Sequence, residues 1–361
     1  MMKLLGKICI GFGLLFSAAQ ADEALTRQVH QQFIDDYIVV HLQSFKAEAQ
    51  ALDTAVTDAC AKDDAPQWQT VKTNFASAVT AWMPLQSMRF DAFEKNSRDL
   101  RTYFWPNSRG EKQAGKFLHK MNMSKLEPSY FHNLSVALQG LPIIEWLLYH
   151  KDSTLFADDQ KLKTYTCNYL AAVTLNLTVI TDELLAEFGN GGAARTILLT
   201  PSDGNALYGA LPEVTLQFYK AVHAMVEMVH GQKLSRPIAN ELQYLKPKRL
   251  EMWRAGLTKV NMTANIASIF DAYKIFSPMI VAAEQGAEID VAIQQQFADT
   301  LQLMNAMPDD FYNALNGDDR PAMWQQSRAL IDQLAVLKNT LAIKGTEALG
   351  IPLGFNALDG D

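Results

Sequence analysis

Apolar residues recur every three or four positions along almost the whole chain, and this helical period is the feature that most restricts its fold. Two clear examples are Trp68, Val71, Phe75, Ala78, Val79 and Trp82, and later Leu330, Leu334, Leu337 and Leu341. Alternating patterns of useful strand length are absent. From Asp22 to Ala65 the chain has no Gly or Pro, which predicts a long first helix. We therefore predict an all-α fold, in which long helices joined by short loops form bundles.

The composition changes most abruptly near the middle of the chain. Gly189-Asn190-Gly191-Gly192 is followed by Pro201-Ser202-Asp203-Gly204-Asn205, and clusters of this kind interrupt helices. A chain of this length is expected to form more than one core. We place an N-terminal helical bundle at residues 22–190 and a C-terminal bundle at residues 191–361.

The first 21 residues have the features of a secretory signal peptide. Lys3 and Lys7 precede an apolar stretch from Ile8 to Ala19. Ala19-Gln20-Ala21 then offers the small residues of a cleavage site before Asp22. The residue directly after that point is Asp22 and not cysteine, which argues against a lipoprotein anchor, and the other apolar stretches are too short or interrupted to span a bilayer. We predict a periplasmic protein with no transmembrane span in the mature chain.

Charge restricts the partners. The formal net charge is −7, and loss of Lys3 and Lys7 with the signal peptide makes it −9. An acidic chain without a basic run argues against nucleic acid and anionic membrane surfaces, and it is compatible with a cationic ligand.

Two cysteines, Cys60 and Cys167, remain once Cys9 has left with the signal peptide. An exported compartment permits a disulfide, which would tie the end of the first long helix to the start of a later one. Two buried free thiols are the alternative, because spacing alone does not supply the geometry of a bridge.

One carboxylate, Glu145, lies in the otherwise uncharged run from Gly140 to Tyr149. Because burying an unpaired carboxylate is costly, we expect an arginine, a metal ion or a proton as its partner. Pro142 fits the first turn of a helix, and Gly140 permits unusual dihedrals at the helix entry. Glu145 is therefore either a metal ligand or general base, or a structural carboxylate.

This run, with its surroundings, resembles the imelysin family of bacterial envelope proteins, whose hallmark is G-x-H-x-x-E. Gly140 and Glu145 stand in register with that motif, whereas Pro142 replaces its histidine. The resemblance continues, in the family's order, at residues 81–89, 104–110, 205–208, 234–237, 251–257, 353–356 and 359–361. It implies two helical bundles packed side by side, related by an approximate internal two-fold, with the motif between them.

Histidine and glutamate three apart on one helix face suit a single cation. With Pro142 in that place, a metal at Glu145 would need ligands from elsewhere, such as His132 or a residue of the second bundle. A second candidate set lies along one helix stripe and includes the Glu-x-x-His spacing of helical di-iron sites: His223, Glu227 and His230. The simpler interpretation is that this stripe is a solvent face.

Arginines supply the candidate partners of Glu145. Arg89 and Arg254 lie in segments typical of the family, and we expect one of them to reach Glu145 as a fork-like partner. Arg98 and Arg101 belong to a charged stretch and are expected at the solvated surface; Arg109 completes the set. The candidate ligand-binding or motif residues are Gly140, Pro142, Glu145, Arg89, Trp105 and Arg254.

Family members are associated with bacterial iron uptake. The resemblance thus implies a non-enzymatic periplasmic protein that binds an iron-related ligand, or another envelope protein, between the two bundles. A metal-dependent peptidase, the activity by which the family was first classified, is the alternative, and the missing motif histidine counts against it. An envelope scaffold is a third. The sequence identifies no catalytic residue and no cofactor; iron or another divalent metal is the candidate cofactor that the resemblance implies.

Overall fold

The computed structural model describes residues 22–351, apart from the side chains of Asp91, Ser108 and Arg109. Within that range the protein is all-α, as predicted, and contains no strand. The predicted signal peptide, residues 1–21, and the segments 353–356 and 359–361 lie outside the described residues. The helices are α2 (Val40–Lys62), α3 (Ala65–Trp82), α4 (Arg98–Thr102), α5 (Ser108–Lys120), α6 (Pro128–Phe131), α7 (Leu141–Tyr149), α8 (Gln160–Phe188), α9 (Ala193–Leu199), α10 (Leu211–Met228), α11 (Arg236–Ile238), α12 (Thr258–Val281), α13 (Gly286–Asn305), α14 (Phe311–Ala314), α15 (Arg320–Thr340) and α16 (Thr346–Leu349).

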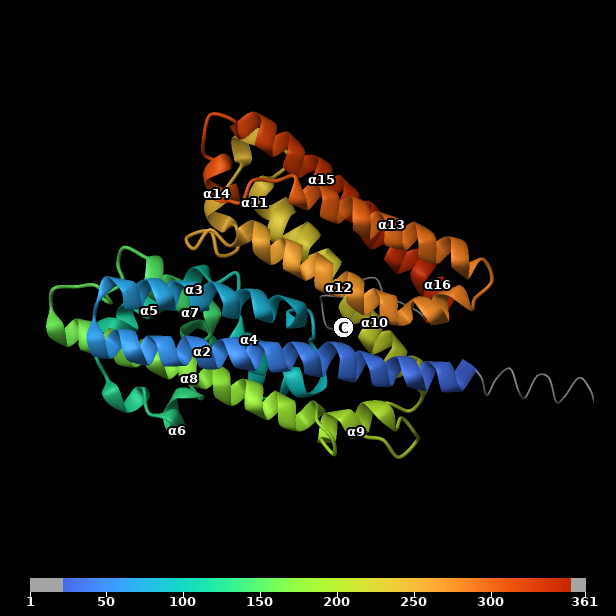
Figure 1. The fold of residues 1–361 in the computed structure, drawn as a ribbon, viewed down its shortest axis with the longest axis horizontal. Coiled ribbons are helices and arrows are strands. Elements are labelled where there is room, and N and C mark those ends of the chain that lie inside the picture. Colours follow the sequence, from blue (N-terminus) through green and yellow to red (C-terminus); the bar gives the residue numbers. More distant parts are fainter. Residues whose placement is uncertain (1–21, 352–361) are drawn as a thin grey trace, which may run out of the picture.

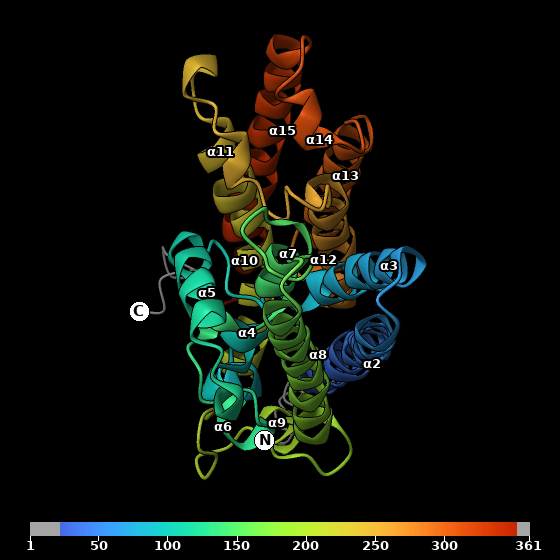
Figure 2. The ribbon, with the colours of Figure 1, turned by 90° about the vertical axis from the view of Figure 1, so that its left-hand side faces the viewer.

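The helices form two groups (Figures 1 and 2). In the N-terminal group α2 packs against α3 and α8, with the shorter α4 to α7 beside them. In the C-terminal group α12 packs against α10 and α13, and α13 packs against α15. The groups meet where α3 and the short 3-10 turn η2 (Met83–Leu85) contact α12. α9 packs against α8. A domain boundary at residue 190 and an internal two-fold remain predictions.

The first helix contacts both groups. Residues 22–32, the π-helical η1 (Phe33–Val39) and α2 continue without interruption to Lys62. At its start, Phe33 stacks on Phe218 of α10 with ring centroids 4.4 Å apart. The helix ends at Lys62, slightly earlier than predicted, because Asp63 adopts a left-handed conformation and Asp64 caps α3 by accepting from the Gln67 N–H.

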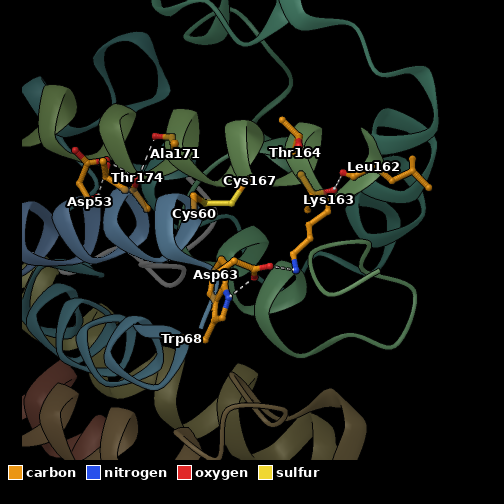
Figure 3. The surroundings of a disulfide bond; sticks show 12 residues. Asp53, Cys60, Asp63, Trp68, Leu162, Lys163, Thr164, Cys167, Ala171 and Thr174 are labelled. Atoms are coloured by element: carbon orange, nitrogen blue, oxygen red, sulfur yellow. Dashed lines mark hydrogen bonds and ion pairs between the residues drawn. A yellow bond between two sulfur atoms is a disulfide. The ribbon is translucent and has the colours of Figure 1, made fainter. Parts of the chain in front are cut away.

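A disulfide joins Cys60 of α2 to Cys167 of α8, with Cα atoms 5.8 Å apart (Figure 3). That separation lies within the usual range for a bridge. Beside it, Lys163 pairs with Asp63, whose other partner is the Trp68 indole N–H. The start of α8 is therefore held against the turn between α2 and α3.

The segment from α8 into α9 is long and apolar. By length and composition alone, the helix at Gln160–Leu199 could cross a membrane, and half of its apolar window is buried inside the protein. Burial of this kind is also typical of a core helix, and α8 packs against α2. The absence of a membrane span in the mature chain therefore stays a prediction.

A buried ion pair lies where the two groups meet. Lys233, in the π-helical η7 (Val229–Ser235), has its Nζ 2.7 Å from Glu251 Oε2, and both side chains are fully buried. Lys233 Nζ also donates to Gln86 Oε1 at 2.7 Å and Asn265 Oδ1 at 2.6 Å. Gln86, which follows η2, donates to Glu251 Oε1 at 3.0 Å. The cluster of Gln86, Lys233, Glu251 and Asn265, called here the buried polar cluster, therefore connects both groups.

We predict that Lys233→Met destabilises the protein by about 3–5 kcal/mol, because it leaves the Glu251 carboxylate buried without its cation. Urea unfolding followed by circular dichroism measures this loss. The exposed Lys344→Met variant is the matched control and should stay within about 0.5 kcal/mol of wild type. Adding Glu251→Gln to Lys233→Met should recover part of the loss; a wild-type stability for Lys233→Met alone would contradict the prediction.

For the disulfide, intact-mass measurement of purified mature protein should show a loss of two hydrogens. The bridge closes a loop with a sequence separation of 107 residues. Its reduction should lower the free energy of unfolding by about 2–5 kcal/mol, chiefly through a less restricted unfolded chain. Titration of two free thiols per native chain would show that the bridge does not form in the protein.

Candidate ligand-binding groove between the helix groups

The helix that carries Glu145 begins at a residue that must be glycine. Gly140 has φ 78°, and a Cβ atom there would lie 2.3 Å from the Thr102 carbonyl oxygen. Pro142 falls in the first turn of α7, where its missing N–H is no loss. From Leu141 to Leu148 every residue of α7 is buried, and Glu145 is only 5% exposed. The sequence therefore places a carboxylate in the protein interior.

Glu145 is held by the loop that follows Glu251. Its Oε1 accepts the backbone N–H groups of Arg254 at 2.9 Å and Ala255 at 3.2 Å. The Arg254 Nη1 lies 3.7 Å from Glu145 Oε2, and the Arg254 Nη2 donates to both carboxylate oxygens of Glu111 at 2.9 and 3.0 Å. Of the three partners considered for Glu145, the structure supplies an arginine.

These contacts do not fully offset burial. Loss of solvent raises the pKa of the Glu145 carboxyl to about 7, although the Arg254 guanidinium and the two backbone N–H groups act to lower it. The Glu111 carboxylate raises the pKa further. Glu145 is therefore a carboxyl that titrates near neutral pH inside the protein.

Glu145 borders a groove of about 310 Å³ between the two groups. One wall comes from Trp105, Glu111, Pro142 and Glu145 of the N-terminal group. The other wall comes from the C-terminal group and contains Arg236, Lys248, Arg249, Trp253 and Arg254. We call this cavity the Glu145 groove.

Three cations of this groove have no carboxylate partner among the described residues, although Lys248 lies 5.9 Å from the Trp253 ring centroid. Arg236, Lys248 and Arg249 are exposed, and the described residues place no carboxylate within ion-pair distance of any of them. Arg254, in contrast, is occupied by Glu111 and Glu145 and lies over the Trp253 ring at 4.6 Å. The groove is therefore more basic than the acidic chain around it.

The side chains at Glu145 do not fit a metal ion. The guanidinium of Arg254 lies where a cation shared by Glu145 and Glu111 would be placed. Among residues 22–351, no three His, Cys, Asp or Glu side chains come together in a way that could hold a metal. Two carboxylates that share an arginine leave no open position between them for a metal ion.

The other sequence candidates lie apart from Glu145. Arg89 is exposed and lines a small neighbouring cavity that also contains Trp105, so Arg254 and not Arg89 reaches Glu145. His132 lies beside α6, where its Nδ1 is 3.2 Å from the Pro128 carbonyl oxygen. The side chain of Arg109 lies outside the described residues.

The stripe of His223, Glu227 and His230 is not a solvent face, contrary to the simpler interpretation. His223 is 6% exposed, and burial with the nearby Lys338 lowers its pKa to about 4. Its Nδ1 lies 3.9 Å from Glu227 Oε2. The reason is that α10 packs between α12 and α15. His230 falls in the π-helical η7, which changes the helical register of the stripe.

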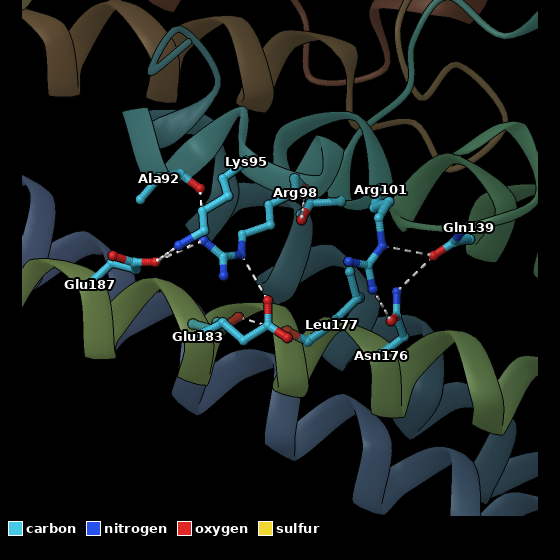
Figure 4. Close-up of polar contacts among 11 residues, drawn as sticks. Ala92, Lys95, Arg98, Arg101, Gln139, Asn176, Leu177, Glu183 and Glu187 are labelled. Carbon is cyan, nitrogen blue, oxygen red and sulfur yellow. Dashed lines mark hydrogen bonds and ion pairs between the residues drawn. The ribbon is translucent and has the colours of Figure 1, made fainter. Parts of the chain in front are cut away.

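We expected Arg98 and Arg101 at the solvated surface, and this prediction is wrong. Each side chain is buried, with 5% of the residue exposed. Figure 4 shows both pointing from α4 towards α8. Arg98 donates to Glu183 Oε2 at 2.7 Å and to the Ala92 carbonyl oxygen at 3.0 Å. Among the described residues, Arg101 donates hydrogen bonds to the amide oxygens of Gln139 and Asn176. A five-residue helix packed on α8 buries both side chains.

Sequence reasoning missed the buried polar cluster and the cations of the groove. Lys233 and Gln86 carry no sequence signal of burial, because lysine and glutamine are usually exposed. Lys248 and Arg249 could have been found, since residues 246–249 read Lys-Pro-Lys-Arg, a short basic run that the argument from net charge overlooked.

Two solved structures share this fold. An imelysin-like protein from Psychrobacter arcticum 273-4 aligns with a TM-score of 0.74 and 16% identity, covering 92% of this chain and 98% of that one. A protein described as an iron-regulated protein A precursor, from Parabacteroides distasonis ATCC 8503, aligns with a TM-score of 0.66 and 15% identity, covering 88% and 95%. No curated protein sequence matches the chain. The imelysin model, of the peptidase M75 type, matches residues 38–341, and this chain therefore belongs to the imelysin family.

Proposed function

We propose that this protein is a periplasmic binding protein of the imelysin family that holds a small anionic ligand, an anionic iron complex, in the Glu145 groove. The observation that carries the proposal is a set of three exposed cations around one cavity, Arg236, Lys248 and Arg249, for which the described residues provide no carboxylate partner. Unpaired charges of one sign lining a concave surface attract a ligand of the opposite sign. The earlier inference from net charge, a cationic ligand, is replaced by this local argument.

The proposal that the ligand contains iron rests on similarity to other proteins. One structural neighbour is described as iron-regulated, and the resemblance of the sequence implied a link to iron uptake. Ferric ions in neutral water are carried by multidentate oxygen ligands, and many such complexes have a net negative charge. An anionic iron complex thus satisfies both the charge of the groove and the family resemblance.

Export is supported by two features of the chain. The first 21 residues read as a signal peptide, and the bridge between Cys60 and Cys167 is of a kind that persists in oxidising compartments. The periplasm is the compartment in which both make sense.

The first test measures binding of ferric citrate to mature protein by quenching of tryptophan fluorescence, since Trp105 and Trp253 line the groove. We expect saturable binding that weakens with salt. The double variant Lys248→Gln/Arg249→Gln should bind at least about tenfold more weakly, because two exposed charges near the ligand are removed. Lys344→Gln is an exposed control outside the groove and should bind like wild type.

Each outcome of this test is informative. Equal affinity of the double variant and wild type would contradict the groove as the binding site. Equal affinity for iron-free citrate would retain an anion site and remove the link to iron. Binding of free metal cations, with no response to the anionic complex, would contradict the proposed ligand class.

The second candidate is a metal-dependent peptidase, and one observation favours it. A buried carboxyl with a pKa near 7 is suited to act as a general base. Against it, the Arg254 guanidinium already occupies the position that a metal shared by Glu145 and Glu111 would take. Chelator-sensitive proteolysis that disappears in Glu145→Gln would favour the peptidase; activity unaffected by chelator would not.

If Glu145 is structural, its titration should appear in stability. Its pKa is raised in the folded state, so its contribution is greatest below the unfolded value of 4.5 and is lost as pH rises through about 7. Relative to Glu145→Gln, wild type should therefore lose roughly 2–3 kcal/mol of unfolding free energy between about pH 5 and about pH 8. Urea unfolding of both proteins at each pH measures this difference.

Comparison with Glu145→Gln isolates this residue, because buried groups such as His30 and His223 titrate in both proteins and cancel. A stability difference that is flat or rises with pH would mean that Glu145 stays ionised throughout this range.

A further inference from the structure

A second cavity, of about 570 Å³, lies between α4, α6 and α8 and shares no lining residue with the Glu145 groove. Its polar wall includes Arg101, Asn176 and Glu183. Its apolar wall includes Leu126, Phe131, Leu175 and Val179. The cavity falls within the usual size of small-molecule sites.

Arg101 is the unusual residue of this cavity. It is 5% exposed, yet its hydrogen bonds go only to neutral amides, from Nε to Gln139 Oε1 at 3.3 Å and from Nη2 to Asn176 Oδ1 at 2.7 Å. Among the side chains that the structure describes, Arg101 Nη1 has no hydrogen bond and the guanidinium forms no ion pair within 4.0 Å. In Figure 4 its second terminal nitrogen carries no dashed line. Because Arg101 lines the cavity, an anionic group bound there can pair with its guanidinium.

The arrangement around Arg101 is fixed in advance. Asn176 Nδ2 donates to Gln139 Oε1 at 3.0 Å, and Gln139 Nε2 donates to the Leu134 carbonyl oxygen at 2.6 Å. These amides hold the guanidinium in one orientation. The neighbouring Arg98 takes Glu183, so this carboxylate is already engaged. Burial lowers the pKa of Arg101, the Glu183 carboxylate acts to raise it, and the Arg98 guanidinium acts to lower it.

We propose that this cavity binds a small monocarboxylate with an apolar body, whose carboxylate accepts hydrogen bonds from Arg101 and whose apolar part lies against α8. A guanidinium donates well to a planar carboxylate. The Glu183 carboxylate in the same wall disfavours a multiply charged anion such as phosphate.

The apolar part of the ligand can pack against exposed apolar side chains of α8 that line the cavity. Leu175 and Val179, one turn apart on α8, are 41% and 43% exposed, which is high for large apolar residues, and both line the cavity. Phe131 and Leu126 are buried opposite. Covering the two α8 side chains with an aliphatic or aromatic group removes their apolar surface from water.

The test uses hexanoate and 4-phenylbutyrate as probes, each beside its neutral amide, with the intact mature protein and isothermal titration calorimetry. The acids should bind at least about tenfold more tightly than their amides, because only the acids pair with Arg101. Arg101→Gln should lose this preference. Val179→Trp fills the cavity but leaves Arg101 intact, and this variant should lose binding altogether. The control is Val336→Trp, at an exposed residue of α15 outside the cavity, which should bind like wild type.

Val179→Trp keeps the proposal testable if Arg101→Gln fails to fold, since it replaces an exposed residue. No saturable binding of either acid up to about 10 mM would overturn the proposal. Equal affinity for acid and amide, or undiminished binding in folded Val179→Trp, would also overturn it. Because no residue is shared with the Glu145 groove, the ferric citrate experiment can fail while this one succeeds.

Discussion

The ion pair between Lys233 and Glu251 is the interaction on which the arrangement of the groove depends. Two charges removed from water are costly, and here Gln86 and Asn265 complete their hydrogen bonding. Because Gln86 belongs to the N-terminal group, the pair fixes one group against the other. The same contact fixes the start of the loop after Glu251, and Thr258 closes that loop by donating to the Glu251 carbonyl oxygen at 2.7 Å.

A loop held at both ends can present its backbone to a buried carboxylate. The N–H groups of Arg254 and Ala255 point to Glu145, and the Arg254 side chain bridges Glu145 and Glu111. Glu145 thus serves as an anchor for the loop that forms one wall of the groove. Inside the groove, the Arg254 guanidinium is paired with Glu111 and Glu145. The cations without a described carboxylate partner, Arg236, Lys248 and Arg249, lie at the exposed edge of the groove. In the proposed function, the groove selects ligands by charge at its rim, while its floor is structural.

The sequence allowed the fold class and part of the site to be predicted. Helical period and the Gly-Pro entry to α7 depend on local rules, and both appear in the structure at the expected residues. Arg254 as a partner of Glu145 followed from a resemblance, not from spacing. Lys233 and Arg101 could not be foreseen, because their burial comes from contacts with residues far away in the chain, and a charged side chain has no periodic signature. For the same reason net charge misrepresented the groove: a local excess of cations is invisible in a sum over the chain.

The proline at 142 makes physical sense in this setting. An imidazole three residues before Glu145 would be useful if a metal ion were to be shared between them, since both would lie on one helix face. Here the positive charge beside Glu145 comes from the Arg254 guanidinium, which needs no further protein ligand. A first-turn proline then stabilises the start of α7 without adding a buried polar group that would need a partner. In this chain Pro142 and the pairing of Glu145 with Arg254 thus fit the same role, a carboxylate that holds a loop in place and needs no metal.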